Sequence, residues 1–349
     1  MLHCRGFSLM PDLVVAGGGP VGLATALYAA RAGLDVVVRE PRPGPVDKAC
    51  GEGLMPGAVA DLAGLGIDPD GHRLSGIRYL GNGRTAEAPF RHGDGRGVRR
   101  TTLHRALSDA LAAAGVPVVP RAVGEVEQRP GHVLVDGEPT AYLVAADGLH
   151  SPVRRMLGLD RPAEGRKRYG QRVHVEIEPW TSFVEVHWAA GSEAYVTPVA
   201  DDLVGIAVLT ERQAPFEELL AEHPALRERV GRRPLSRTRG AGPLRQRSTR
   251  QVDGRVLLVG DAAGYVDALT GEGIAIGLAQ ARAAVDAVVA GRPERYAAAY
   301  PRLGRRHVLL TRALLTSSRA PVVRRRIVPL AARLPRVFTG VVDQLARPA

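Results

Sequence analysis

Residues 12–33 read DLVVAGGGPVGLATALYAARAG. The Val-rich run at the start predicts a buried strand, and three consecutive glycines end it. The residues that follow have helical spacing as far as Gly33, a residue suited to the end of a helix. Another apolar run, residues 34–40, predicts a second strand. This order of strand, glycine turn, helix and strand favours an α/β fold of the Rossmann type.

Three glycines of this stretch have the spacing of a dinucleotide-binding turn, Gly-x-Gly-x-x-Gly. Gly17 permits the tight turn, Gly19 lets the backbone approach a diphosphate, and Gly22 lets the helix lie close to the strand. Pro20 and Val21 begin the helix, whose first N–H groups are free to bind an anion. The motif therefore predicts a dinucleotide site.

Glu40 ends the second predicted strand, about twenty positions beyond the glycines. A carboxylate at this place accepts hydrogen bonds from ribose hydroxyls and repels a ribose 2′-phosphate. The expected ligand is therefore NAD or FAD.

The composition argues against several other classes of protein. With 349 residues and 45% hydrophobic side chains, the chain can bury a large core. The net charge is +11, but the basic residues are nearly all Arg, occur along the whole chain and accompany no nucleic-acid motif, so nucleic acid is not an expected partner. Two distant cysteines, Cys4 and Cys50, indicate a reducing compartment, and a cytoplasmic location is expected. No apolar run approaches the length of a membrane span, and no His/Cys spacing indicates a metal site.

Two later segments each combine a short apolar run with an aspartate next to a glycine. One is ADGLHSPVR, residues 146–154, and the other is VGDAAG, residues 259–264. On structural grounds alone, Asp147 and Ser151 would cap the following helix, and Asp261 would form an Asx turn.

Taken in order with GGGPVG, these segments resemble the FAD-dependent hydroxylase superfamily, the group with the p-hydroxybenzoate hydroxylase fold. Its members include aromatic monooxygenases, flavin-dependent halogenases and geranylgeranyl reductases. The resemblance implies that the glycine turn holds the ADP half of FAD. It also implies that the Asp-Gly motif supports the diphosphate and relates to NAD(P)H use, and that the Gly-Asp motif contacts the ribityl chain.

The same resemblance places the loop 269–273 beside the flavin ring, where glycines let backbone N–H groups approach. Arg100 matches an FAD-contacting R-x-x-L-x-x-x-L pattern, although it is equally well explained as a solvated residue at a helix start. The residues that the resemblance adds to the expected FAD site are Arg100, Asp147, Gly148, Gly260, Asp261, Gly271, Gly273 and Ile274.

Residues 48–54, KACGEGL, resemble a C-G-x-G-L stretch that geranylgeranyl reductases place near the flavin. Cys50 is therefore a candidate catalytic residue, the alternative being an inert, partly buried thiol. Glu52 stands where many relatives have Gly, and it either lines the pocket or bonds the loop.

Between residues 170 and 210 the apolar residues alternate with period two, which predicts an antiparallel sheet with one covered face. The resemblance implies that this sheet covers the substrate cavity. Hydroxylation of a phenol needs an acid–base group, and the candidates are His187 and Tyr195, followed by His174. The alternative for each is an outward or packed residue of the sheet.

The predicted fold is α/β, with a Rossmann-type FAD-binding domain and an inserted antiparallel β-sheet substrate domain. The expected FAD-binding domain comprises residues 10–75, 98–165 and 250–300, and the substrate domain comprises residues 76–97 and 166–249. Residues 301–349 form a basic helical segment, which would either touch anionic lipid and guide an apolar substrate inward or pack on the flavin domain.

The leading prediction for function is an NAD(P)H-dependent monooxygenase. The resemblance implies that O2 adds to reduced FAD at C4a and that an aromatic or polyketide-type small molecule is hydroxylated. One alternative is a geranylgeranyl reductase-like enzyme that saturates isoprenoid double bonds. Another is a flavin-binding protein without catalytic activity.

Overall fold

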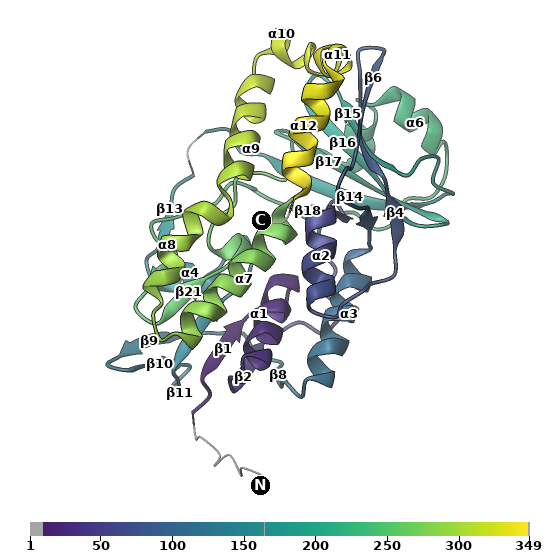
Figure 1. The fold of residues 1–349 in the computed structure, drawn as a ribbon. Coiled ribbons are helices and arrows are strands. Elements are labelled where there is room, and N and C mark those ends of the chain that lie inside the picture. The colour runs from purple at the N-terminus through teal and green to yellow at the C-terminus, as the bar shows by residue number, and fades with distance from the viewer. Residues whose placement is uncertain (1–9, 164, 348–349) are drawn as a thin grey trace.

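The computed structural model describes residues 10–163 and 165–347 and thus excludes Cys4. Two large sheets organise it, one in the lower half of Figure 1 and one at the upper right. The first has six strands in the order β20-β21-β12-β1-β2-β8, and all pairs except β20 with β21 are parallel. Their bounds are β1 Leu13–Ala16, β2 Val36–Arg39, β8 Val118–Val119, β12 Tyr142–Ala145, β20 Val252–Asp253 and β21 Val256–Leu258. This sheet is the predicted Rossmann-type unit.

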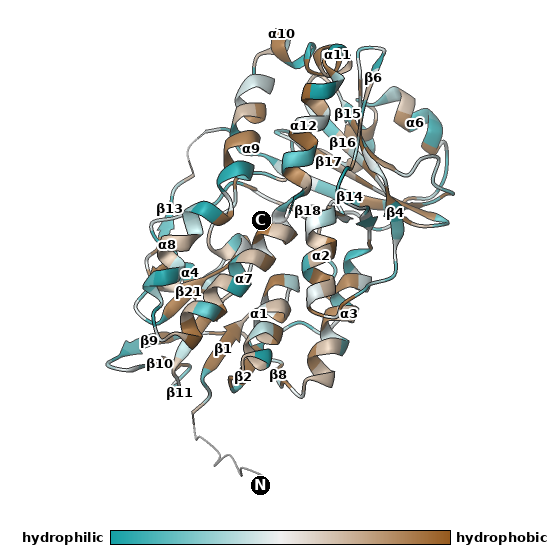
Figure 2. Ribbon diagram, viewed as in Figure 1, coloured by the Kyte–Doolittle hydropathy of each residue, from teal (hydrophilic) through white to brown (hydrophobic). Residues whose placement is uncertain are grey.

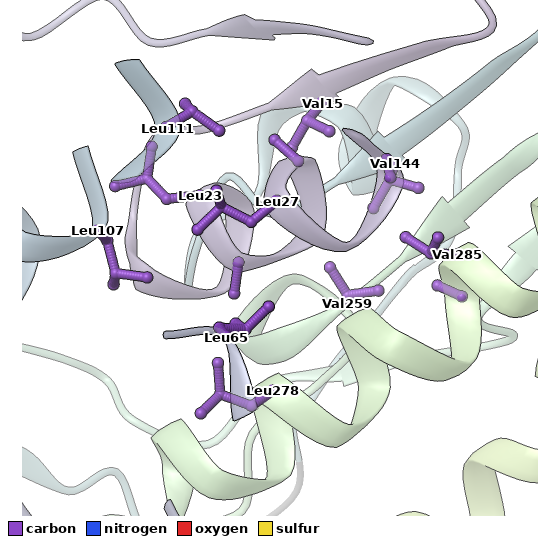
Figure 3. Packing of buried hydrophobic residues seen from close by; sticks show 14 of the residues in the cluster. Val15, Leu23, Leu27, Leu65, Leu107, Leu111, Val144, Val259, Leu278 and Val285 are labelled. Atoms are coloured by element: carbon purple, nitrogen blue, oxygen red, sulfur yellow. The ribbon is translucent and has the colours of Figure 1, made fainter. Parts of the chain in front are cut away.

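Helices α1 (Pro20–Arg31), α3 (Arg100–Ala113) and α7 (Gly273–Val289) pack together in the largest apolar cluster. Figure 3 shows Leu23 and Leu27 of α1 at its centre, with side chains of α3 on one side and of α7 on the other. The close approach of α1 depends on glycine, because a Cβ on Gly22 would lie 1.8 Å from the carbonyl oxygen of Gly17. Gly17 itself has φ +101°, which disfavours any side chain.

The second sheet has seven strands in the order β18-β14-β17-β16-β15-β5-β6. Their bounds are β5 Gly76–Gly81, β6 Arg84–Pro89, β14 Tyr169–Glu176, β15 Phe183–Trp188, β16 Ser192–Ala200, β17 Leu203–Thr210 and β18 Arg239–Ala241. The pair β5 and β15 is parallel, so the predicted antiparallel sheet is antiparallel in every pair but one.

Both faces of this sheet are covered along β14, where one covered face was predicted. Val173 and Val175 pack under the short helices α5 (Phe216–Leu220) and α6 (Pro224–Val230). On the opposite face Arg172 and His174 are only 2% and 5% exposed. A period-two pattern cannot distinguish a solvated polar face from one whose charges are paired inside the protein.

Smaller elements connect these layers. A three-stranded sheet consists of β3 Gly53–Leu54, β4 His72–Leu74 and β7 Gly95–Gly97, and another of β9 Val126–Arg129, β10 His132–Val135 and β11 Glu138–Thr140. The pair β13 Asp160–Arg161 and β19 Arg247–Ser248 is separate, and the remaining early helices are α2 Pro56–Gly64 and α4 Pro152–Met156.

The chain ends in helices α8 Glu294–Leu303, α9 Arg305–Ser318, α10 Pro321–Arg324, α11 Ile327–Arg333 and α12 Pro335–Ala346. Phe338 and Val342 of α12 join a buried cluster with Ile77 and Ala88 of β5 and β6. Helix α12 therefore packs on the seven-stranded sheet (Figure 1), whereas Leu303 of α8 packs against the core of the flavin domain and His307 of α9 bonds Glu272 at the start of α7, so the predicted packing on the flavin domain describes only the first part of the segment. Of the helices in the described ranges, none is both long and apolar enough to cross a bilayer.

Candidate active site

A cavity of about 970 Å³ is lined by residues of the seven-stranded sheet, of the segments that follow strands of the parallel sheet, and of the C-terminal helices. It brings together Gly19, Asp147 and Asp261 from distant parts of the chain, because the ends of β1, β12 and β21 lie at the same edge of the parallel sheet. The predicted site residues on its wall are Gly19, Pro20, Val21, Cys50, Arg100, Asp147, Gly148, Tyr195, Gly260, Asp261, Gly271, Gly273 and Ile274.

Gly17, Gly22 and Glu40 form the turn beneath this wall. The backbone N–H of Gly18 donates to Glu40 Oε2 at 2.8 Å, and the Arg42 guanidinium pairs with the same carboxylate at 2.7 Å. Burial acts to raise the pKa of Glu40, but these hydrogen bonds outweigh it and lower the pKa below its ordinary value. Glu40 therefore remains ionised and holds the glycine turn in place.

Arg42, Lys48 and Arg100 are three of the cationic side chains that line the cavity, and Arg172 and Arg326 also line it. Burial, and then repulsion from Arg42 and Arg100, lowers the pKa of Lys48. Crowding of like charges in a buried place favours an anionic ligand. The sequence analysis missed Arg42 and Lys48 as site residues, although Lys48 is one of only two lysines among 47 basic residues.

Among the side chains that line the cavity, three buried polar atoms have no partner within the described part of the chain, namely Arg100 Nε, Asp147 Oδ1 and Arg172 Nε. The other oxygen of Asp147 accepts from the N–H of Val153 at 3.0 Å, and Ser151 Oγ accepts from the N–H of Arg154 at 2.9 Å. Asp147 and Ser151 thus cap α4, which confirms the helix cap predicted for these two residues. Asp147 Oδ1 remains available to a ligand. A ligand with both an anionic group and hydroxyl donors fits this wall.

Asp261 lies in a 3₁₀ turn that follows β21. Burial raises the pKa of Asp261, and the nearby charges of Arg100 and Lys48 oppose that shift. The turn is held from below by Arg154, which is fully buried and donates to the carbonyl of Ala262 at 2.9 Å. Gly260, with φ +59°, donates to Gln280 Oε1 at 2.8 Å. Arg154 therefore supports the turn that carries Asp261. The sequence analysis gave Arg154 no role, although it is the last residue of the motif at residues 146–154.

On the substrate side, Cys50 and Glu52 belong to the loop after Lys48. The thiol accepts a hydrogen bond from the N–H of Glu52 at 3.4 Å, and burial raises the pKa of Cys50, so the thiol keeps its proton at neutral pH. Glu52 Oε2 lies 2.7 Å from His174 Nε2, and Glu52 Oε1 accepts from the N–H of Arg100 at 2.8 Å. His174 Nδ1 lies 3.1 Å from Arg172 Nη1, which can only donate. His174 therefore donates through Nε2 to Glu52.

The two leading acid–base candidates occupy different places. Tyr195 lines the cavity, but its hydroxyl donates to the carbonyl of Leu269 at 2.7 Å, and burial raises its pKa well above the ordinary value. His187 is not among the residues that line this cavity, and its Nε2 lies 3.1 Å from Glu185. Tyr195 thus supports the loop beside the predicted flavin ring, and His187 lies outside the site.

The model of a family described as FAD binding domain matches residues 11–290. The chain belongs to this FAD-binding family. It lies in the FAD-dependent hydroxylase superfamily, as predicted, and it is an FAD-dependent oxidoreductase. The unpartnered atoms of Arg100 and Asp147, together with the three cations, fit the diphosphate and hydroxyl groups of FAD.

Among curated relatives, the menaquinone reductase of Mycolicibacterium smegmatis is 32% identical, with 85% of this chain and 80% of that protein covered. The digeranylgeranylglycerophospholipid reductase 1 of Methanothermobacter thermautotrophicus is 28% identical over 76% of this chain and 74% of that protein. Among solved structures, the flavin-dependent brominase Bmp2 has a TM-score of 0.80 at 16% identity and covers 97% of this chain and 93% of its own. The predicted fold class is thereby confirmed.

Proposed function

We propose that this FAD-dependent oxidoreductase is a reductase that saturates carbon–carbon double bonds in an isoprenoid lipid. The observation that carries the proposal is the apolar extension of the cavity. Beyond the FAD-binding wall, the lining consists largely of aliphatic side chains from the C-terminal helices: Leu310, Leu314, Val323, Ile327, Leu330, Leu334, Val337, Val341, Val342 and Leu345. A long hydrocarbon chain would bury its surface there without leaving polar groups unpaired.

The names of two relatives point in the same direction. One is a menaquinone reductase, and the other is a reductase of a digeranylgeranyl lipid. Their reductase names and the aliphatic lining together support reduction of a lipophilic substrate over hydroxylation of a compact phenol.

Saturation of one double bond adds two electrons and two protons to the substrate, which is equivalent to a hydride and a proton. FAD, once reduced, supplies the hydride equivalent, and we propose NAD(P)H as its reductant. Gly19, Arg42, Lys48, Arg100 and Asp261 would hold the cofactor. The protonated thiol of Cys50 is the candidate proton donor, because it faces the same cavity and burial keeps its proton on Sγ.

The test is an anaerobic single-turnover experiment. FAD-loaded protein reduced with dithionite is mixed with geranylgeraniol or a menaquinone, and flavin reoxidation is followed by absorbance while products are examined by mass spectrometry. We expect reoxidation and a product that is two hydrogen atoms heavier in its isoprenoid chain; menaquinone products are reoxidised in air before analysis, because reduction of the quinone ring to the quinol also adds two hydrogen atoms. Cys50→Ala should keep its flavin absorbance but slow reoxidation by about a hundredfold or more. Failure to reduce any isoprenoid, with folded and flavin-loaded protein, would overturn the proposal.

Hydroxylation through a flavin hydroperoxide stays a prediction. Neither leading acid–base candidate supports hydroxylation, because His187 lies outside the cavity and the hydroxyl of Tyr195 is bonded to the carbonyl of Leu269. Substrate-dependent O2 consumption that yields a hydroxylated phenol would restore it.

A further inference from the structure

The C-terminal cap, defined here as α9 to α12 and residues 305–346, holds most of the exposed apolar side chains of the described chain. Ten large hydrophobic residues are conspicuously exposed, and seven lie in the cap: Leu309, Val322, Val323, Leu330, Leu334, Val337 and Val341. Figure 2 shows the cap helices gathered at one end of the molecule, with hydrophobic and hydrophilic residues interleaved along them. A concentration of this kind marks an interaction surface.

Four apolar residues of the cap form a stripe that runs from α11, through the break at Leu334, along α12. Leu330, Leu334, Val337 and Val341 are separated by four, three and four positions, and their exposed fractions range from 39% to 60%. They also line the cavity, so this stripe forms a mouth through which the cavity meets the outside. Val322 is 65% exposed and does not line the cavity, so the apolar surface continues beyond the mouth.

The cap also carries much of the positive charge of the protein. Residues 305–346 contain nine arginines, no lysine and one acidic residue, Asp343, which gives the cap a formal charge of +8, against a net charge of +11 for the whole chain. The exposed arginines of α9 to α12 include Arg305, Arg306, Arg312, Arg325, Arg326, Arg333 and Arg336. None of these seven is within ion-pair distance of an acidic side chain of the described residues.

The cap is held firmly in this arrangement. Arg324 pairs with buried Glu193 at 2.7 Å, donates to the carbonyl of Ala189 at 2.6 Å and stacks over Trp188 at 5.3 Å. Phe338 and Val342 turn the opposite face of α12 into the sheet. The part of the apolar stripe that lies on α12 is therefore one face of a packed helix.

A surface that combines aliphatic side chains with unpaired arginines matches the interface of an anionic bilayer, where chains enter the acyl region and guanidinium groups meet lipid phosphates. A second copy of the chain would bring two such cationic caps together, which charge repulsion opposes. We propose that the cap docks the protein on the surface of an anionic phospholipid bilayer, with the cavity mouth toward the lipid. This inference goes beyond the proposed function and does not depend on it.

The test is flotation of the FAD-loaded full-length protein with vesicles, without substrate or turnover. Vesicles of phosphatidylcholine alone are compared with vesicles that contain phosphatidylglycerol, over a range of NaCl concentrations. We expect binding to the anionic vesicles that falls as salt is raised. Arg333→Ala/Arg336→Ala and Val322→Asp should each weaken binding about tenfold or more. None of these positions lines the cavity.

Matched controls change the same residue types elsewhere on the surface. Arg105→Ala/Arg232→Ala removes two exposed charges, and Val289→Asp changes an exposed valine of α7, so both should bind vesicles like the parent protein. The proposal is overturned if folded protein binds no vesicle, if it binds neutral and anionic vesicles equally, or if the control variants lose binding as much as the cap variants. Self-association that Val322→Asp abolishes, without vesicle binding, would instead assign this face to a second copy.

Discussion

Glu52 offers a sharp test of how the substrate side of the site is built. Its carboxylate is 3% exposed, accepts from His174 and from the N–H of Arg100, and lies 3.8 Å from Arg172. Its backbone has φ +60°, a left-handed conformation that costs a non-glycine residue about 1–2 kcal/mol. The chain therefore tolerates strain at this position, and the pairing of a buried carboxylate is the compensating interaction.

Two substitutions separate these contributions. Glu52→Ala removes the carboxylate but keeps the strain, and it should lower the free energy of unfolding by about 3 kcal/mol, since it leaves buried donors unpaired. Glu52→Gly removes the carboxylate and the strain, so it should be about 1 kcal/mol less destabilised than Glu52→Ala, after allowance for the larger freedom of glycine in the unfolded chain.

The free energy of unfolding is measured on FAD-loaded protein by urea denaturation, with Trp fluorescence and circular dichroism as independent probes of a single transition. Glu87→Ala is the control, because Glu87 is 48% exposed and pairs with Arg78 at the surface, where loss of an ion pair costs about 0–1 kcal/mol. The reasoning is refuted if Glu52→Ala is as stable as the parent protein. It also fails if Glu52→Gly is no more stable than Glu52→Ala.

Three further outcomes follow from the site and the sheet. Asp261→Ala should weaken FAD binding about tenfold or more, measured by flavin fluorescence, whereas exposed Asp286→Asn should not; equal effects would remove Asp261 from the site. Tyr195→Phe should cost about 1 kcal/mol of stability through its lost bond to Leu269 and should change turnover only a few fold, and a loss of a hundredfold or more would reveal an acid–base role. Burial lowers the pKa of His223 from 6.5 to about 4, so the folded protein binds fewer protons than the unfolded chain between these values, and stability is lost as pH falls through that window. Unfolding measured at pH 4 and pH 7 should therefore show a smaller pH dependence in His223→Gln, and an unchanged dependence would contradict this origin.

Local sequence was sufficient for the fold class and for the cofactor family. The strand, glycine turn and helix at residues 13–31 obey constraints that act over a few residues, such as the closeness of Gly22 to Gly17. The Asp-Gly and Gly-Asp motifs are similarly short. Each motif could be recognised because its chemistry depends on neighbours in the chain, and the family match confirms the family that the motifs together predicted.

The tertiary structure alone decided how the site is completed. Glu52 meets His174 across 122 positions, and Lys48 joins Arg100 in one cavity, although nothing in the local pattern connects them. Alternation along β14 predicted an open polar face, but ion pairs bury Arg172 and His174 there. The sequence left open whether residues 301–349 meet lipid or pack on the flavin domain, and only the packing of α12 on β6 turned Phe338 inward and left Val337 at the cavity mouth. Periodicity records which side chains are apolar, whereas burial, pairing and the shape of a cavity depend on which distant segments the folded chain brings into contact.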